Sequence, residues 1–298
     1  MWLVLCYWVT AAILASGSTA VVVRPCRPAY WYTRNGVIHT TCQPRNRNCT
    51  ILIRGLSYHD KNDFLRRHNK LRSQVAMGRL RGFKQAANMY ELEWDDELAE
   101  VAQALADQCG DMVHDKADAR FTSNFKVTGQ NLASERRSNE VRKMDGLRFV
   151  DTWFKEHRDY PPSQVKHFLP NFSRRPTGHF TQMIWADTQY LGCGFTMFRM
   201  KSDFDAMPYQ KHYVCNYGHS GNIKGRPVYM EGPTCSRCPV GSRCVKRTGL
   251  CRARKRNQRA LGRPRSKPRA RPQNSGLAAG RMRQQHIAMC AAKGGRKC

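Results

Sequence analysis

The sequence predicts an α+β fold, because segments with helical periodicity come first and segments with strand character come last. Apolar residues recur at helical spacing in three segments between residues 60 and 159, whereas residues 191–198 and 212–216 have the composition of strands. There is no strict repeat of strand, helix and strand. The pattern therefore favours a layered α+β domain.

The first helix is expected to begin at Asp60, with Asp63 at its third position in a capping box. Its apolar stripe consists of Phe64, His68, Leu71 and Val75. A second helix is expected after Asp95, and its apolar face consists of Leu98, Val101, Ala102, Leu105 and Cys109. A third helix is expected over residues 139–159, where Pro161-Pro162 ends it.

The N-terminus and the cysteines indicate export. Residues 1–20 are interpreted as a signal peptide, because an apolar stretch runs into the small-x-small pattern Ser18-Thr19-Ala20. Of the 13 cysteines, Cys6 lies in this segment, which leaves an even number for a disulfide framework. Sequons at Asn48 and Asn171 would be glycosylated if exposed. No later stretch is apolar enough to span a membrane, so we expect a soluble extracellular protein.

Composition divides the rest of the chain into four regions. Residues 21–57 are punctuated by cysteines and loop-like, and residues 58–231 contain every clear periodic pattern. Residues 232–251 form a short, cysteine-rich, hinge-like segment. Residues 252–298 are rich in Arg, Pro, Gly and Gln, and we expect them to be disordered. The net charge of +29 is uneven, because no Asp or Glu follows Glu231.

Two long motifs carry a family resemblance. They are GHFTQMIWADT at 178–188, followed by LGCG, and HYVCNYGHSGNI at 212–223. With three earlier segments, 64–73, 89–109 and 129–133, they resemble the CAP superfamily of cysteine-rich secretory, antigen 5 and pathogenesis-related proteins. The leader GVIHTTC is most similar to the antigen 5 branch of arthropods. The resemblance covers roughly residues 26–251 and implies an α-β-α sandwich, with a small antiparallel sheet and a cleft above it.

The resemblance also implies a set of disulfides, namely Cys26–Cys42, Cys49–Cys109 and Cys193–Cys215. Four further cysteines open with a CxxC spacing that would fit either zinc or two disulfides, and export favours disulfides. These four are Cys235, Cys238, Cys244 and Cys251. Cys290 and Cys298 match no family position, and could pair with each other or with another chain.

CAP proteins commonly place two histidines and two acidic residues in the cleft. Mapped by motif, these positions are His114, Gln130, Glu156 and His179. The amide of Gln130 replaces one carboxylate, so a two-carboxylate mechanism is not available. His114 and His179, with Glu156, could hold a divalent cation such as zinc or a small ligand, or carry out acid–base chemistry. The alternative is a hydrogen-bonded network that only fixes the walls of the cleft.

Two classes of function follow. The favoured one is a secreted, non-enzymatic binding protein that needs no cofactor and acts on an extracellular protein target, as allergenic antigen 5 relatives of venomous or blood-feeding arthropods do. The second is a protease or esterase that works through the cleft histidines and Glu156. The missing carboxylate and the absence of a nucleophile motif count against it. Lipid or sterol binding, known in relatives, leaves no mark in this sequence.

The basic C-terminal segment offers a second binding surface. Its runs at 252–256 and 263–271 are dense in Arg and Lys, the second one spaced by prolines, and they contain no aromatic residue. Outside the cell, such runs would bind sulfated glycosaminoglycans, and hence heparin, or anionic lipid surfaces. The alternative is a solvated tail without a dedicated partner. Specific nucleic-acid recognition is not expected, because no aromatic side chain is available for stacking.

Overall fold

The computed structural model describes residues 26–31, 34–170, 173–201 and 206–254. Residues 1–20, Asn171, Cys290 and Cys298 lie outside the described residues, so the expectations for them stay predictions. Contacts divide the chain into two units, Met1–Arg254 and Lys255–Cys298, and all described residues belong to the first. None of the described helices is both long enough and apolar enough to cross a membrane.

A mostly antiparallel sheet forms the centre of the domain. Its strands lie in the order β1 (Cys49–Arg54), β4 (Tyr190–Met200), β5 (Tyr209–Gly218) and β3 (Gly129–Arg137). The short β2 (Glu93–Trp94) adds a parallel pairing at the start of β4. Both expected strands are present, as parts of β4 and β5, whereas β1 and β3 were not expected from the sequence. The strand β1 corrects the expectation that residues 21–57 are loop-like.

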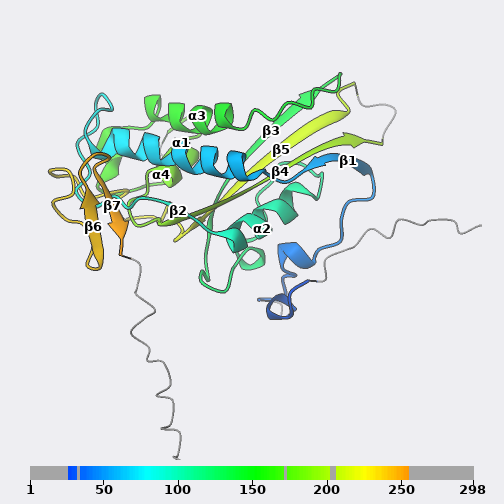
Figure 1. Cartoon of the computed structure of the whole chain (residues 1–298), viewed down its shortest axis with the longest axis horizontal. Coiled ribbons are helices and arrows are strands. Elements are labelled where there is room, and N and C mark those ends of the chain that lie inside the picture. The colour runs from blue at the N-terminus through cyan, green and yellow to red at the C-terminus, as the bar shows by residue number, and fades with distance from the viewer. Residues whose placement is uncertain (1–25, 32–33, 171–172, 202–205, 255–298) are drawn as a thin grey trace, which may run out of the picture. The chain divides into compact units, whose positions relative to one another are not determined.

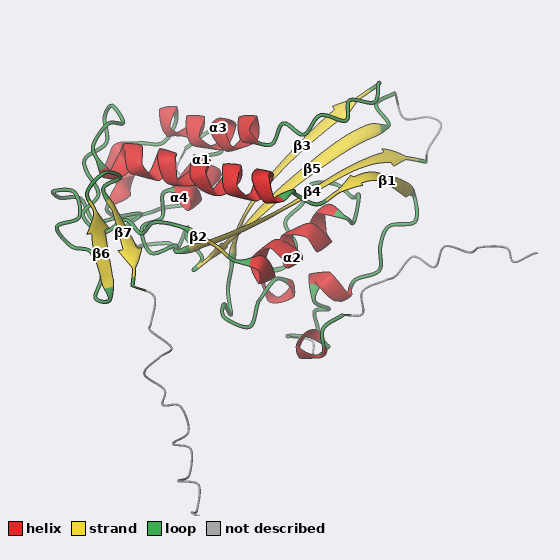
Figure 2. Cartoon of the chain, viewed as in Figure 1, coloured by secondary structure: helices red, strands yellow, loops and turns green. Residues whose placement is uncertain are grey.

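Helices cover both faces of this sheet (Figure 1). The helices α1 (Tyr58–Ala76), α3 (Leu147–Lys155) and α4 (Gly178–Met183) lie on one face, and α2 (Asp96–Ala106) lies on the other, as Figure 2 shows by element type. The predicted α+β class and the α-β-α sandwich are therefore confirmed. The main core lies beneath α1, α3 and α4, and a smaller apolar cluster lies beneath α2.

The start of α1 differs from the predicted start. Ser57, not Asp60, is the N-cap, because its side chain accepts the backbone N–H of Asp60 while the Asp60 carboxylate accepts the backbone N–H of Ser57 at 3.0 Å. This is a capping box shifted by three residues from the expected one. It satisfies two N–H groups that the first turn would otherwise leave unpaired.

The third helix is shorter than predicted. It begins at Leu147 rather than near residue 139. Gly146, just before it, packs so closely that a Cβ there would lie 2.3 Å from the ring of Phe64 and 2.9 Å from that of Tyr213. Glycine disfavours helix and here permits this close approach, so the segment before it stays irregular.

The close packing of α2 on the sheet depends on two glycines in β4. A Cβ at Gly192 would lie 2.2 Å from the backbone nitrogen of Ala99, and one at Gly194 would lie 2.4 Å from the Cα of Gln103. Both clashes are with the backbone of α2. On the opposite face, Cys193 forms a disulfide with Cys215 of β5. In the LGCG motif, the two glycines therefore contact α2, while Cys193 between them faces the main core.

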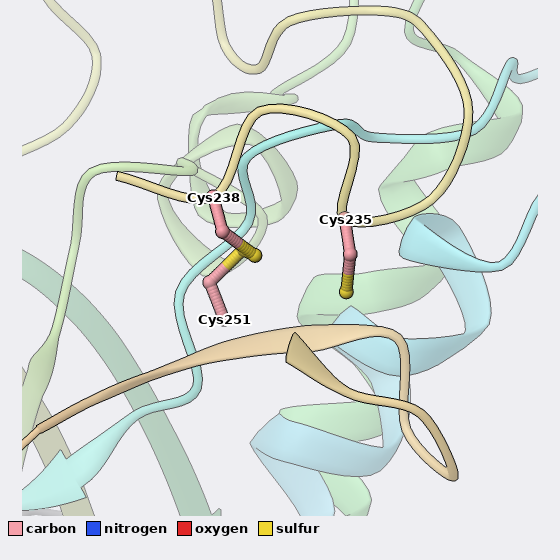
Figure 3. A group of neighbouring side chains, drawn as sticks. All are labelled: Cys235, Cys238 and Cys251. Carbon is pink, nitrogen blue, oxygen red and sulfur yellow. A yellow bond between two sulfur atoms is a disulfide. The ribbon is translucent and has the colours of Figure 1, made fainter. Parts of the chain in front are cut away.

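The structure contains five disulfides among the described residues. Three are the pairs that the family resemblance implied, Cys26–Cys42, Cys49–Cys109 and Cys193–Cys215. The others are Cys235–Cys244 and Cys238–Cys251. Sulfur atoms of Cys235, Cys238 and Cys251 lie within 4.8 Å of one another (Figure 3), but each is bonded in a disulfide and so is not available as a thiolate ligand.

The segment predicted to be hinge-like is part of the domain. It contains the hairpin of β6 (Ser242–Val245) and β7 (Leu250–Ala253), whose Leu250 is fully buried in the main core. The backbone N–H of Cys251 donates to the carbonyl of Met89 at 2.8 Å. The tail was predicted to begin at Arg252. In the structure Arg252 belongs to β7 and forms a bidentate ion pair with Glu91.

Candidate functional site

A cleft of about 490 Å³ opens beside α4. Three of the four predicted residues line it: His114 from the loop after α2, Gln130 from β3, and His179 from the first turn of α4. Glu156 follows α3 and contacts His179 without being one of the lining residues. The structure thus brings the four positions together around one cavity.

His179 is held by Glu156. Its Nδ1 lies 2.6 Å from Oε1 of Glu156, while Oε2 of the same carboxylate accepts the backbone N–H of Phe180 at 3.1 Å. A carboxylate can only accept, so Nδ1 carries the proton and donates. The indole of Trp153 lies nearly parallel to the imidazole, at 18° and 5.8 Å between centroids. The ring is therefore fixed with its Nε2 as the free nitrogen, because no described residue bonds to it.

His114 is held in the same way by an amide. Its Nδ1 lies 2.8 Å from Oε1 of Gln130. The Nε2 of Gln130 donates to Oδ1 of Asp115 and to Oδ1 of Asn216, each at 3.0 Å. Two oxygen acceptors on one side fix the orientation of the amide, so its own oxygen faces His114 and Nδ1 must donate. As at His179, the free nitrogen is Nε2.

Asp115 is a site residue that sequence reasoning missed. Its side chain is 4% exposed and forms a 2.9 Å salt bridge with Arg120, and the hydroxyl of Thr40 donates to its other oxygen at 2.5 Å. By motif, the second acidic position of the family falls at Gln130, whose side chain is an amide. The carboxylate that supports this amide comes from the residue after His114. In the sequence, the only indication of a role for Asp115 is its position next to His114.

Comparison with known proteins decides the family. A family model described as "CAP: Cysteine-rich secretory protein family" matches residues 65–217. The chain belongs to this family. Its match includes both predicted motifs up to Tyr217 and all four cleft positions, so the expected CAP domain is confirmed.

Several arthropod proteins are similar to this CAP protein. A CRISP/Allergen/PR-1 protein of Trittame loki is 41% identical over 220 residues, which cover 73% of this chain and 52% of that protein. Venom allergen 5 of Tityus serrulatus is 36% identical over 232 residues, with coverages of 74% and 54%. The chain thus spans about half the length of these two relatives. Scoloptoxin SSD976 of Scolopendra dehaani is 36% identical over 204 residues, with coverages of 68% and 89%.

Solved structures agree on the fold. A structure of NaASP2 with Zn²⁺ is 30% identical, with a TM-score of 0.53, and covers 66% of this chain and 97% of that one. The structure of BmVAL-1 is 26% identical, with a TM-score of 0.54 and coverages of 66% and 95%. These similarities confirm the CAP sandwich.

A buried chain of hydrogen bonds links α1 of the CAP domain to the cleft. Nδ1 of His68 lies 2.8 Å from the carbonyl of Phe64, so it donates, and Nε2 accepts from the hydroxyl of Tyr217 at 3.0 Å. Tyr217 in turn accepts from Asn131 at 3.1 Å, and Asn131 also donates to the carbonyl of His179. Burial lowers the pKa of His68 to about 4, so it is neutral at physiological pH.

The cleft offers two imidazoles that each donate Nδ1–H to an oxygen and leave Nε2 free of described partners. Within the described ranges, no serine, threonine or cysteine side chain bonds to either Nε2, so neither histidine is paired with a nucleophile. His157 is directed elsewhere, since its Nδ1 bonds to the carbonyl of Phe154 at 2.8 Å and its ring packs against Phe83 and Phe180. The arrangement suits a ligand, such as a metal ion, that is coordinated by two imidazole nitrogens.

Proposed function

We propose that this chain is a secreted, non-enzymatic CAP protein whose cleft binds a divalent cation of the zinc type through Nε2 of His114 and His179. The observation that carries the proposal is the orientation of the two imidazoles. Each donates its Nδ1–H to an oxygen acceptor, Gln130 or Glu156, which is the arrangement usual for metal-ligating histidines. NaASP2, a structural relative, was solved with Zn²⁺.

Water would complete the coordination of such a cation. Among the described residues, no third histidine, cysteine or carboxylate forms a metal-sized cluster with these two histidines. The carboxylates nearby are used otherwise, since Glu156 holds His179 and Asp115 holds Gln130 and Arg120. A site with two protein ligands and open positions would bind zinc less tightly than a structural site with four.

Equilibrium dialysis against zinc tests this proposal. The wild-type protein should retain one zinc ion, and the double variant His114→Ala/His179→Ala should retain none. His59→Ala, which changes an exposed histidine on α1, is the matched control and should bind as the wild type does. Glu156→Ala should weaken zinc binding by about 10–100-fold, because it removes the acceptor that orients His179.

Two results would contradict the proposal. Equal zinc retention by the double variant would exclude the two histidines as ligands. Turnover of a peptide or ester library that is lost in the same double variant would show that the cleft is catalytic. The far-ultraviolet circular dichroism of each variant should match that of the wild type, so that a loss of zinc is not a loss of fold.

We also propose that the basic segment after Arg254 retains the protein on extracellular polyanions such as sulfated glycosaminoglycans. The support is charge: 13 of the 51 Lys and Arg residues follow Arg254, and no Asp or Glu does. In a salt gradient on heparin, the full chain should elute at clearly higher salt than a chain that ends at Arg254. Ending the short chain there keeps β7 and the Arg252–Glu91 pair intact. Elution of both at the same salt would refute the proposal.

A further inference from the structure

The hairpin of β6 and β7, with the loop before it, carries a cluster of cations and no acidic residue. Residues 232–254 contain six basic side chains, namely Arg237, Arg243, Lys246, Arg247, Arg252 and Arg254. All of them are exposed except Arg252, which is partly buried. Among the described residues, the only salt bridge of this segment is that of Arg252 with Glu91. We call the five exposed cations the basic hairpin surface.

The hairpin places two like charges opposite each other. Arg243 of β6 is the register partner of Arg252 of β7. Glu91 accepts hydrogen bonds from Arg252 through both of its oxygens and, together with a weaker effect of Glu93, raises the pKa of that guanidinium. Both oxygens of Glu91 are thus used at Arg252, and Arg243 has no such partner. Like charges directly opposite each other destabilise a ladder, so the stability of the fold does not explain an arginine at this position.

The part of the domain beside the hairpin is also positively charged. The C-terminal end of α1 lies next to it (Figure 1). Residues 64–86, which include this end of α1 and the loop after it, contain seven Lys or Arg and no Asp or Glu. Glu231, just before the cationic segment, lies 3.5 Å from both Lys84 and Lys166, so two cations share this carboxylate. The neighbouring carboxylates therefore do not neutralise the basic hairpin surface.

Two disulfides fix the segment that carries these cations. Cys235–Cys244 joins the loop before the hairpin to β6, and Cys238–Cys251 joins the same loop to β7. Cys251 is fully buried, which anchors the hairpin in the domain. A ligand that binds here does not have to order the backbone first, so the entropic cost of binding is small.

The exposed cations are spread along the length of the hairpin. At its open end, the backbone N–H of Arg254 donates to the carbonyl of Gly241 at 2.8 Å, which continues the pairing one step beyond β7. Arg243 lies within β6, and Lys246 and Arg247 lie in the turn at the other end. With a rise of about 3.3 Å per residue, these positions span roughly 15 Å. A row of charges of this length suits a linear polyanion better than a single small anion.

The residue types in this segment select the class of polyanion. Residues 232–254 contain no aromatic residue, so they lack the side chains that stack on bases or anchor a protein at a membrane interface. Four of the five exposed cations are arginines, whose guanidinium group binds oxyanions through two parallel hydrogen bonds. The five disulfides of the described residues indicate an extracellular setting, where the common linear polyanions are sulfated polysaccharides.

We propose that the basic hairpin surface is a folded binding site for a sulfated glycosaminoglycan chain. The polysaccharide lies along the hairpin, with sulfate groups at Arg243 and at Lys246 and Arg247 of the turn. The choice of partner rests on the proposed secretion of the protein, but the site does not depend on the segment after Arg254. Binding is electrostatic and therefore weakens as the salt concentration rises.

Binding of the full chain to a heparin dodecasaccharide tests the proposal. The test variant removes three cations of the surface, Arg243→Gln/Lys246→Gln/Arg247→Gln. The matched control removes three exposed cations near β1 and before β3, Arg45→Gln/Arg47→Gln/Lys126→Gln. At about 0.15 M salt, the test variant should bind about tenfold more weakly than the wild type, the range for the loss of three exposed ion pairs. The control, which has the same net charge, should bind within about twofold of the wild type.

The salt dependence separates this site from the basic segment after Arg254. The slope of the logarithm of the binding constant against the logarithm of salt concentration should be shallower by about two to three in the test variant. If only the proposal for the segment after Arg254 fails, the full and shortened chains elute alike from heparin, while the test variant still elutes before the control. If only the hairpin proposal fails, the shortened chain elutes early, while the test variant and the control elute together.

Chemical modification locates the ligand without any variant. Heparin should protect Arg243 and Arg247 of the full chain from phenylglyoxal, as read by peptide mass, while Arg45 and Arg47 should react equally with and without heparin. The proposal is overturned if the test variant binds the dodecasaccharide as tightly as the control, or if the two hairpin arginines are not protected. It is also overturned if the test variant loses binding to phosphatidylserine vesicles but not to heparin, since the surface would then be a membrane site.

Discussion

At the scale of the residue, the least expected feature is a fully buried arginine without a carboxylate partner. Arg72 of α1 is 0% exposed, and no described salt bridge involves it. Instead its guanidinium donates to five backbone carbonyls, those of Tyr90, Met183, Trp185, Ala186 and Thr188. Burial lowers the pKa of Arg72 to about 9, so the side chain is still protonated at neutral pH.

Arg72→Met should therefore destabilise the domain severely. Each buried carbonyl left without a donor costs about 1–3 kcal/mol, so we expect the free energy of unfolding to fall by at least about 3 kcal/mol. Urea denaturation measures it. Arg66→Met, on the exposed side of the same helix, should change the value by less than about 0.5 kcal/mol. If Arg72→Met lowers the free energy of unfolding no more than Arg66→Met does, water has replaced the guanidinium as the donor to these carbonyls.

Acid should destabilise the protein between pH 6.5 and pH 4. His68 has a pKa of about 4 in the folded state, below the ordinary value of 6.5, so the unfolded chain binds a proton in this range that the folded chain does not. Stability is then lost as pH falls, by about 3 kcal/mol for this histidine at pH 4. His212 acts in the same direction.

The measurement is urea denaturation at a series of pH values. His68→Gln should be less stable at pH 7 and should lose less stability than the wild type between pH 6.5 and pH 4. Part of the loss should remain, because burial also lowers the pKa values of His212 and His39. An unchanged pH slope in His68→Gln would mean that other groups cause the acid sensitivity of the wild type.

The sequence predicts those residues of the cleft that lie at positions defined by the family motifs, and it does not predict the others. His114, Gln130, Glu156 and His179 follow from family positions, and the structure gathers them at one cleft. Asp115 was missed because a single aspartate in a loop has no pattern. Its role depends on Gln130 and Arg120, which lie further along the chain, and only the fold brings these groups together.

At the scale of the element, the contact between α2 and β4 requires glycine. Gly194→Ala should lower the free energy of unfolding by about 1–3 kcal/mol or more, because a Cβ would overlap the backbone of Gln103, which is not free to move aside. Thermal denaturation measures the change. Gly110→Ala is the control, since the nearest atom to its added Cβ is 4.0 Å away. Equal melting temperatures for the two variants would show that α2 can shift outward at no cost.

The strand β3 was missed for a physical reason. The strand β3 contains a single strongly apolar side chain, Leu132, and ends in Glu135-Arg136-Arg137, so its composition does not indicate a strand. It forms because β5 offers a full antiparallel ladder, from Gly129 opposite Tyr217 to Arg137 opposite Tyr209. This pairing depends on β5, which lies about eighty residues further along the chain, so the local periodicity of β3 does not predict it.

At the scale of the whole molecule, the C-terminal hairpin closes the domain. It lies beside the C-terminal end of α1 (Figure 1), where the hydroxyl of Thr234 donates to the carbonyl of Ala76 at 2.9 Å. Leu250→Ala should lower the free energy of unfolding by about 2–5 kcal/mol, as for any buried leucine. Val240→Ala, at a fully exposed position of the same segment, should have almost no effect on urea denaturation. A small loss at Leu250 would restore the hinge-like interpretation of residues 232–251.

Arg72 also limits how this domain could be re-used. An engineer who grafted the 178–188 motif onto another scaffold would leave the carbonyls of Met183, Trp185 and Thr188 without the donor that stands 111 residues before Met183 in the chain. The smallest portable unit is therefore the motif together with α1. For the same reason, natural recombination that separates these two segments should yield chains that do not fold.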